Sequence, residues 1–204
     1  AEKMPHAWKA GAQTQLLVQR LNALKDGDLI VMVAPPNPYR CPPGPYERIS
    51  MFAHVLKGKG FTKSKIIILD PKPNFSKQAL FMEGWEKHYP GMIEWQDPKM
   101  HGGIKGVDVS TMTVKTDLAD YKAQLVNVIP AQMAGKIARD AGLTNESGFC
   151  PIKPESMQSA KAENVYVIGD ASIAGDMPKS AFSANSQAKV AAMTIRGELT
   201  KSPT

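Results

Sequence analysis

An apolar run that leads into a proline-rich loop constrains this chain more than any other feature of its sequence. The run is Ile30–Val33, which is typical of a buried strand in a parallel sheet. Six prolines follow between residues 35 and 45, with Cys41 among them, and the pattern after Pro45 is helical. A strand, a loop and a helix in this order normally form a nucleotide-phosphate site, in which glycines expose backbone N–H groups. Proline has no N–H group, so this loop is unfit for a phosphate and presents a thiol instead.

The rest of the chain alternates helical and strand patterns. We expect helices over residues 8–24, 46–56, 76–89, 132–141 and 183–199, and strands over residues 28–34, 64–70, 92–95, 125–129 and 164–170. A meander is predicted over residues 107–116, with a turn near Ser110 and Thr111. This order predicts an α/β fold: a Rossmann-like, nicotinamide-type domain with a parallel sheet and a β-meander. We place a boundary after Lys122, which gives one domain over residues 1–122 and another over residues 123–204.

Asp70 ends the strand predicted over residues 64–70, where it has two interpretations. In a nucleotide-binding domain, an acidic residue at this place contacts a ribose. Because the prolines make the preceding loop unfit for a phosphate, Asp70 is better interpreted as a turn residue at the end of a strand.

Composition narrows the classes of partner and of site. The 204 residues carry a net charge of +6, but the lysines are scattered with few aromatic residues among them, which disfavours nucleic-acid binding. The positive charge favours an acidic partner or an anionic substrate. No signal peptide opens the chain, and its start resembles the middle of a protein, so we infer a fragment. No metal site is expected, because metal-ligand spacing is lacking among the histidines, which are His6, His54, His88 and His101.

A second strong signal is the pair Gly169 and Asp170 at the end of the last predicted strand. In flavin enzymes, an aspartate at this place accepts a hydrogen bond from a ribityl hydroxyl. The helix that starts near Ser183 would direct its positive end at the flavin N1–C2=O edge, and Lys179 would reinforce this effect. A strand, turn and helix with a capping aspartate explains the same pattern, and the spacing does not separate the two interpretations.

Cys41 and Glu47 lie on the proline loop and at the start of its helix. A lone cysteine is most often an inert small hydrophobe, but Arg40, Arg48 and a helix N-terminus favour a thiolate here. Glu47 would either complement the helix dipole, which the sequence slightly prefers, or accept a proton beside the thiol. Cys150 would pair with Cys41 only if the fold brings their Cα atoms within about 6 Å.

With these motifs in view, the chain resembles the flavoprotein subunits of flavocytochrome c sulfide dehydrogenases. These belong to the flavoproteins with two dinucleotide-binding domains, which include sulfide:quinone reductases. The resemblance covers essentially the whole chain, which would be the middle half of such a subunit, without the N-terminal glycine-rich motif and the C-terminal domain. It rests on the segments PYRCPPGPYER, FSKQ, NVIPAQMAG, GFCP and VIGDASIAGDMPKSAFSANSQAKV.

The resemblance implies a set of site residues and partners. Cys41 would be half of a redox-active disulfide whose partner lies beyond this chain, and Glu47 would be a base. Gly169, Asp170 and Lys179 would contact FAD, so residues 123–204 would be part of an FAD-binding domain. A periplasmic location and a c-type cytochrome partner are also implied.

The implied function is sulfide oxidation to sulfur or polysulfide, with electrons passing through the disulfide and FAD to the cytochrome. As a fragment, the chain is expected to be inactive alone and to bind FAD weakly or not at all. Two alternatives remain: a sulfide:quinone or NAD(P)H-linked flavoprotein reductase, and a non-catalytic binding module that keeps the fold. The proline loop argues against a nicotinamide, whereas haem and quinone are not separated as acceptors.

Overall fold

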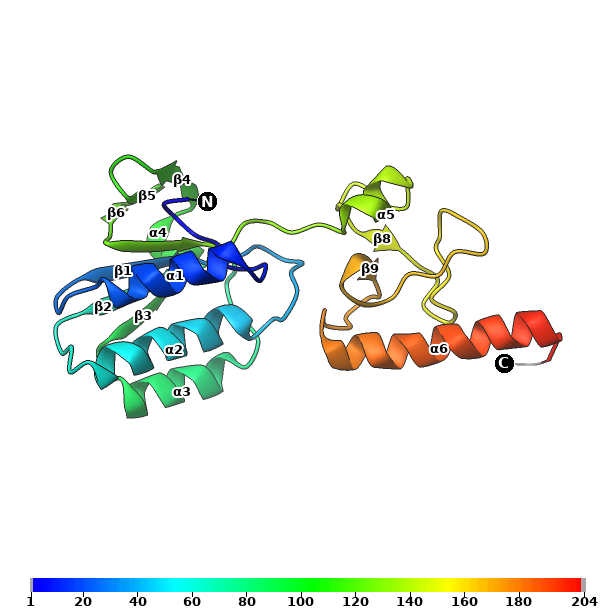
Figure 1. Ribbon diagram of the computed structural model, residues 1–204, viewed down its shortest axis with the longest axis horizontal. Helices are drawn as coiled ribbons and strands as arrows, with labels where there is room; N and C mark the ends of the chain where they lie inside the picture. The colour runs from blue at the N-terminus through cyan, green and yellow to red at the C-terminus, as the bar shows by residue number, and fades with distance from the viewer. Residues whose placement is uncertain (1, 203–204) are drawn as a thin grey trace. The chain divides into compact units, whose positions relative to one another are not determined.

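Two compact units make up the computed structural model, which describes residues 2–202 (Figure 1). The first unit contains the residues up to Asn37 together with Pro43–Ala131. The second contains Pro38–Pro42 together with the residues from Gln132 onward. The sequence places the boundary after Lys122, but the next strand, β7 (Leu125–Val128), pairs with β1 (Leu29–Val33) and so lies in the first unit. The ends of the two predicted domains, residues 1 and 203–204, lie outside the described residues.

The first unit is built on a four-stranded parallel sheet. Its order is β3-β2-β1-β7, with β2 spanning Lys65–Leu69 and β3 spanning Ile93–Gln96. All neighbouring strands run parallel, which confirms the predicted α/β fold. Alternate residues of a strand face opposite sides of a sheet, and β1 is buried on both sides. Ile30 and Met32 therefore join one hydrophobic cluster, and Val31 and Val33 join another.

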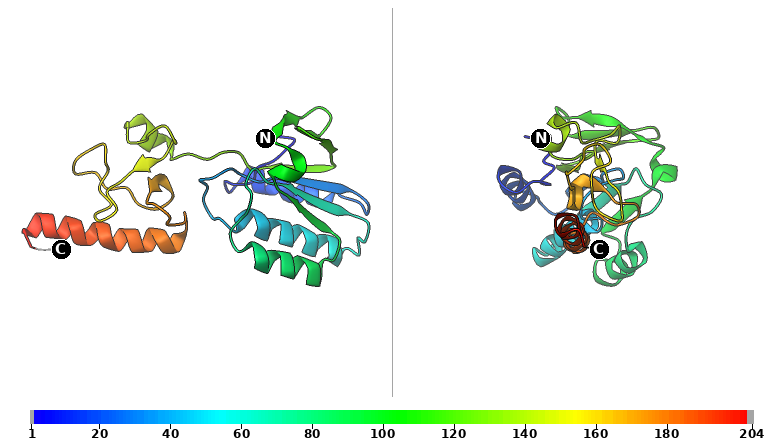
Figure 2. Two further views of the ribbon diagram at one scale, coloured as in Figure 1. Left: turned by 180° about the vertical axis from the view of Figure 1, so that it is seen from behind. Right: turned by 90° about the vertical axis from the view of Figure 1, so that its right-hand side faces the viewer.

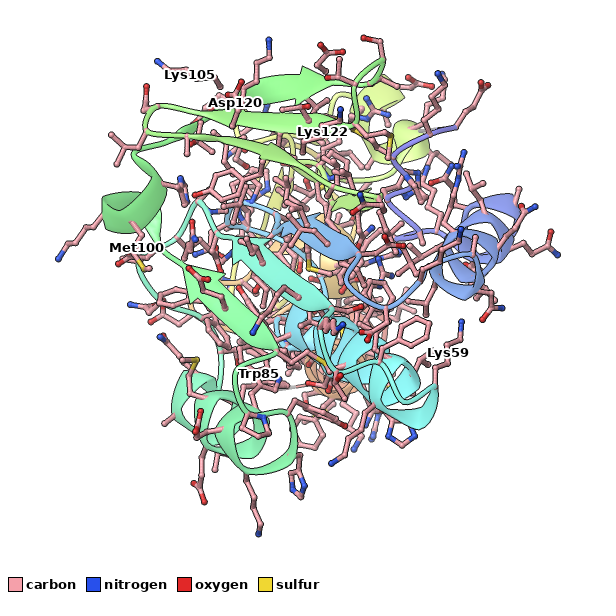
Figure 3. The ribbon with its side chains drawn as sticks, turned by 90° about the vertical axis from the view of Figure 1, so that its left-hand side faces the viewer. Lys59, Trp85, Met100, Lys105, Asp120 and Lys122 are labelled. Carbon is pink, nitrogen blue, oxygen red and sulfur yellow. The ribbon has the colours of Figure 1, made fainter. Side chains whose placement is uncertain are left out.

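Three helices supply the first cluster. They are α1 (Ala12–Asn22), α2 (Gly44–Gly58) and α3 (Gln78–His88). Each full burial of a large apolar side chain contributes about 1.5–3 kcal/mol, and α2 contributes most, with fully buried Ile49 and Leu56. Trp85 of α3, labelled in Figure 3, is also buried and stacks with Phe75. The predicted amphipathic face of α2 is thus the face that packs in the core.

A short helix and a meander follow β3, and the meander covers the other side of the sheet (Figure 3). The antiparallel order β4-β5-β6, with a turn at residues 110 and 111, confirms the predicted meander. The Asp108 side chain fixes this turn by accepting hydrogen bonds from the N–H groups of Ser110 and Thr111. The elements are α4 (Pro98–His101), β4 (Ile104–Asp108), β5 (Thr113–Thr116) and β6 (Asp120–Lys122).

The second unit has little regular structure apart from one long helix. Its elements are α5 (Lys136–Asp140), β8 (Cys150–Pro151), the 3₁₀ turn η1 (Gly169–Ala171), β9 (Ser172–Ile173) and α6 (Ala181–Thr200). The last of these confirms the helix predicted over residues 183–199, and it is unbroken in the left-hand view of Figure 2. Within residues 2–202, no helix is both long and apolar enough to cross a membrane.

Two predicted elements of the second unit differ from the structure. Residues 164–170 do not form a strand, because the described residues pair with this segment through a single bridge, between Gln158 and Tyr166. The helix predicted over residues 132–141 is reduced to α5. Its first part is irregular, and there the Ala134 N–H group donates to the Gly148 carbonyl at 2.8 Å instead of to a helical partner.

Candidate active site

The loop that carries Cys41 belongs to the second unit and is held there by hydrogen bonds. The backbone N–H of Arg40 donates to Oε1 of Gln132 at 3.1 Å, and that of Cys41 donates to the Lys179 carbonyl at 2.8 Å. Within the loop, the Tyr39 hydroxyl donates to the Pro42 carbonyl at 2.8 Å. The thiol of Cys41 is free and exposed. The loop therefore presents this thiol from a backbone that is fixed on both sides.

The backbone of Cys41 adopts a conformation that its residue type disfavours. Its φ of 54° lies in the left-handed region, which costs a residue with a Cβ atom roughly 1–2 kcal/mol. Strain of this kind persists only where the surroundings enforce it, and it gathers at functional sites. The hydrogen bonds at Arg40 and Cys41 supply that enforcement.

Lys179 joins the Cys41 loop to the Gly-Asp turn. Its backbone carbonyl accepts the Cys41 N–H, whereas its Nζ donates to the carbonyls of Asp170 at 2.9 Å and Ser172 at 2.6 Å. The ammonium also lies over the ring of Phe149, 3.9 Å from the centroid. Burial lowers the pKa of Lys179, partly offset by the Asp170 carboxylate. One residue thus fixes both of the loops that the sequence singled out.

Gly169 is required by the geometry of the Gly-Asp turn. Its φ is +69°, and a Cβ atom built on it would lie 3.4 Å from the Cβ of Ala184 on α6. Its N–H group donates to Oε1 of the buried Gln187, also on α6, at 2.6 Å. The turn therefore lies against the first part of α6 and leaves the Asp170 side chain exposed.

The start of α6 is a capped helix N-terminus. The Ser180 hydroxyl accepts a hydrogen bond from the Ser183 N–H group at 3.2 Å. A helix N-terminus carries about half a positive charge, which favours an anion. An exposed carboxylate that can accept a hydrogen bond from a hydroxyl, the positive end of a helix and a lysine ammonium are a set of groups that fits a flavin, whose reduced ring is anionic. The residues of this turn could therefore hold the ribityl chain and stabilise the reduced ring.

Cys150 lies in the same unit, but in a different environment. It is fully buried in β8, which pairs with β9, and both cysteines are free thiols. Burial raises the pKa of the Cys150 thiol, although the charge of Lys179 opposes this effect. Its partners in a small hydrophobic cluster are Ala134 and Phe149. These features are those of a packing residue rather than of a nucleophile.

The predicted site residues are divided between the two units. Cys41, Gly169, Asp170 and Lys179 lie in the second unit, where the hydrogen bonds of Lys179 connect them. Glu47 lies in the first turn of α2 in the first unit, with its side chain exposed.

Arg48, which the sequence suggested as a neighbour that favours a thiolate, also lies in the first unit. Its guanidinium donates to the carbonyls of His6 at 2.7 Å and Ala7 at 2.6 Å. It also lies 4.9 Å from the ring centroid of Trp8. Burial lowers the pKa of Arg48 to about 10. Arg48 therefore anchors the N-terminal segment.

The carboxyl edge of the parallel sheet, where such folds bind dinucleotides, holds a buried polar cluster around Asp70. Its carboxylate accepts hydrogen bonds from Tyr46 Oη at 2.5 Å and Trp95 Nε1 at 3.0 Å. Lys72 adds its Nζ at 2.7 Å and its backbone N–H at 3.0 Å. The bond to the N–H group two residues ahead is that of an Asx turn, which confirms the turn interpretation of Asp70.

Sequence reasoning missed the residues that hold the site together. Gln132, Gln187 and Phe149 each contact a predicted site residue or its neighbour across a long stretch of chain. None of the three belongs to a recognisable spacing. All three lie within segments that carry the family resemblance, which are NVIPAQMAG, GFCP and VIGDASIAGDMPKSAFSANSQAKV.

Comparison with known proteins gives a family and a fold. The model of the central region of the flavoprotein chain of sulfide dehydrogenase (flavocytochrome c) matches residues 14–130, more than half of the chain. Among solved structures, a chain of the Tetrahymena thermophila mitochondrial ATP synthase has a TM-score of 0.59 at 18% identity, covering 98% of this chain and 49% of that one. Lactococcus lactis thioredoxin reductase has a TM-score of 0.55 at 14% identity, covering 88% and 55%.

A third similar structure is an engineered water-forming NADPH oxidase bound to NADPH. Its TM-score is 0.56 at 13% identity, with 100% of this chain and 44% of that chain covered. At these identities the likeness shows the fold alone. The chain spans about half the length of the solved structures that it matches.

Proposed function

Because the chain belongs to the family of the flavoprotein chain of flavocytochrome c sulfide dehydrogenase, we propose that it is part of an enzyme that oxidises sulfide. The family is one of flavin-dependent oxidoreductases, and it points to FAD as the cofactor. The observation that carries the proposal is the connection through Lys179. Its carbonyl holds the backbone of an exposed, strained thiol, and its ammonium holds the turn that fits a flavin.

In the proposed reaction, Cys41 enters as half of a disulfide. Hydrosulfide attacks the Cys41 sulfur, a new S–S bond forms, and the partner cysteine leaves as a thiolate. The product is a persulfide on Cys41, so sulfide has lost two electrons and the disulfide has gained them. The left-handed conformation and the two hydrogen bonds fix the backbone that carries the attacked sulfur, and the Cys41 side chain is exposed.

The Gly-Asp turn and α6 would hold the FAD. The cofactor, when bound, supplies a two-electron acceptor that can release electrons one at a time. Asp170 would accept a hydrogen bond from a ribityl hydroxyl. The N-terminus of α6 and the charge of Lys179 would favour negative charge on the ring. Lys179 also orients the turn, since it binds the carbonyls of Asp170 and Ser172.

Glu47 has two roles open to it, and we propose that it is the base of the reaction. Its exposed carboxylate on the first turn of α2 is accessible to a proton donor. The other role is to complement the dipole of α2. A Glu47→Gln variant separates them, because loss of the dipole term lowers stability by roughly 0.3–1 kcal/mol, whereas loss of a base lowers turnover by about 10²-fold or more.

We propose a c-type cytochrome as the partner, because the name of the family contains flavocytochrome c. We also propose a periplasmic location, which the resemblance of the sequence implies. The test uses the complete protein that carries this chain. Its visible spectrum should show a bound flavin, and sulfide should reduce a c-type cytochrome. A protein without flavin absorbance contradicts the proposal of a flavoenzyme. Reduction of a quinone but not of cytochrome shows that the acceptor is wrong.

The Cys41→Ser variant tests the thiol. It should keep the flavin spectrum and lose sulfide turnover, since no disulfide can form at this position. Cys150→Ala is the matched control, because it removes the buried cysteine of the same unit and should retain turnover. Undiminished turnover in Cys41→Ser would remove Cys41 from the mechanism.

A further inference from the structure

Gln132 is attached to the site in a way that the proposed function does not yet use. Its Oε1 accepts the Arg40 N–H at 3.1 Å, and the next N–H along the chain, that of Cys41, donates to the Lys179 carbonyl. Arg40 and Lys179 are also bridged as in a parallel sheet. The Cys41 loop is therefore fastened to the body of its unit at two successive residues.

The two fastenings differ in kind. The bond to Lys179 uses a backbone carbonyl, which any residue at that position would provide. The bond to Gln132 uses a side chain, so it depends on the identity of residue 132. Cys41 has a left-handed backbone although it is not a glycine. Such a strained conformation persists only where neighbouring residues hold it in place. The Gln132 side chain thus stabilises a strained conformation, and a substitution at residue 132 can remove this stabilising contact.

The NH₂ group of the Gln132 amide indicates that packing alone does not account for a glutamine at this position. Its Nε2 atom is buried and has no hydrogen-bond partner among the described residues. A buried donor without a partner is unfavourable, and an apolar side chain of similar length would avoid this penalty. What an apolar residue could not provide is the acceptor for the Arg40 N–H group.

We propose that Gln132 is a positioning residue that fixes the thiol of Cys41 for reaction. The inference rests on the proposed function, in which Cys41 is the sulfur that sulfide attacks. Gln132 itself takes no part in bond formation. It acts through the backbone of Arg40, which it holds beside the left-handed Cys41. The segment of Gln132 is in turn anchored at Ala134, whose N–H group donates to Gly148.

Three variants of the complete protein test this role. Gln132→Met keeps the length of the side chain and removes the acceptor. Gln132→Glu restores an acceptor oxygen without the unpartnered NH₂ group. Gln124→Met is the matched control, because Oε1 of Gln124 also accepts a backbone N–H, that of Leu29 at 2.9 Å, but lies in the first unit.

The main readout is the rate of alkylation of reduced Cys41 by iodoacetamide, followed by peptide mass spectrometry. This readout requires neither flavin nor turnover. In Gln132→Met we expect the rate to change by a factor of about 3 to 10, the scale of one lost hydrogen bond. Gln132→Glu and Gln124→Met should react as the wild type does. Thermal unfolding of Gln132→Met should match that of the wild type, because a lost hydrogen bond and a removed unpartnered donor oppose each other.

Several outcomes decide the matter. An unchanged alkylation rate in Gln132→Met overturns the proposal, as does an equal change in Gln124→Met. Failure of Gln132→Glu to restore the rate overturns the assignment to the acceptor oxygen. Sulfide turnover is measured in parallel and should fall in Gln132→Met at unchanged flavin content. If the wild type itself does not oxidise sulfide, the proposed function fails while the alkylation result still decides the role of Gln132.

Discussion

The ammonium of Lys179 lies 3.9 Å from the ring centroid of Phe149, directly before Cys150 in the chain. The same ammonium binds the carbonyls of Asp170 and Ser172. A cation shared between a ring and two carbonyls holds three segments of the second unit together. This arrangement makes Lys179 a structural centre of the unit as well as a residue of the candidate site.

Lys179→Met should therefore weaken both stability and flavin binding. Each hydrogen bond from a charged donor contributes about 1.5–3 kcal/mol. Because Lys179 is only half-buried, its two bonds lie near the lower end of this range and together contribute roughly 3 kcal/mol. Urea unfolding gives the stability, and fluorescence titration gives the FAD affinity. Lys189→Met, which removes an exposed lysine of α6, is the control and should change neither. Equal effects of the two substitutions would contradict the role of Lys179.

Gly169→Ala should damage the Gly-Asp turn. The substitution imposes a penalty of roughly 1–2 kcal/mol for a left-handed residue with a Cβ atom, and the new methyl group contacts Ala184. Gly175→Ala is a matched control, because its φ of +59° gives the same penalty while its Cβ would have no neighbour within 4 Å. Flavin retention during gel filtration should fall in Gly169→Ala only. Loss of flavin in both variants would show that flavin retention does not depend on the contact between the Gly-Asp turn and α6.

Lys72→Met should destabilise the first unit by about 3–5 kcal/mol, since it leaves the fully buried Asp70 carboxylate without its cationic partner. It also removes the donor to the Pro35 carbonyl at 2.6 Å. The double variant Lys72→Met/Asp70→Asn should recover part of this loss. Lys105→Met breaks the exposed pair with Asp117 and should change the melting temperature little, because water screens that pair. Similar melting temperatures for Lys72→Met and the wild type would disprove a stabilising pair.

The Asp108 carboxylate, which fixes the turn of the meander, should take up its proton only at low pH. Hydrogen bonds from Ser110 and Thr111 lower the pKa of Asp108 to about 2 from its usual 3.8. The folded state therefore binds this proton more weakly than the unfolded state does. The contribution of the Asp108 carboxylate to the free energy of unfolding is fully present above pH 3.8. It is lost as the pH falls through about 2. Carbon-detected NMR of the Asp108 carboxyl gives the midpoint, and a midpoint near 3.8 would contradict the hydrogen bonds. Asp108→Asn should remove this part of the pH dependence of unfolding.

The parallel sheet and its helices could be predicted because their signals are local. The run Ile30–Val33 forms β1 together with Leu29, and the apolar spacing of Ile49, Phe52 and Leu56 reports the buried face of α2. Propensity and periodicity act over a few residues, so a sequence shows them directly.

The details of the candidate site depend on residues that are far apart in the chain. Arg40 and Gln132 are 92 positions apart, and no pattern in either segment indicates their hydrogen bond. The left-handed backbone of Cys41 lies next to that contact, and a cysteine in the sequence gives no indication of it. The segment 164–170 was predicted as a strand from its apolar residues alone. A strand also needs hydrogen-bonded neighbouring strands, and among the described residues this segment forms a single bridge, between Gln158 and Tyr166.

The assignment of Pro38–Pro42 to the second unit affects any attempt to divide the gene. Most of that unit is encoded in one stretch, but the segment that carries Cys41 is encoded between two stretches of the other unit. A clone that begins at Gln132 would encode the Gly-Asp turn and α6 without the thiol of Cys41. Supplying the missing segment as a separate synthetic peptide would then measure how strongly Gln132 and Lys179 attract it.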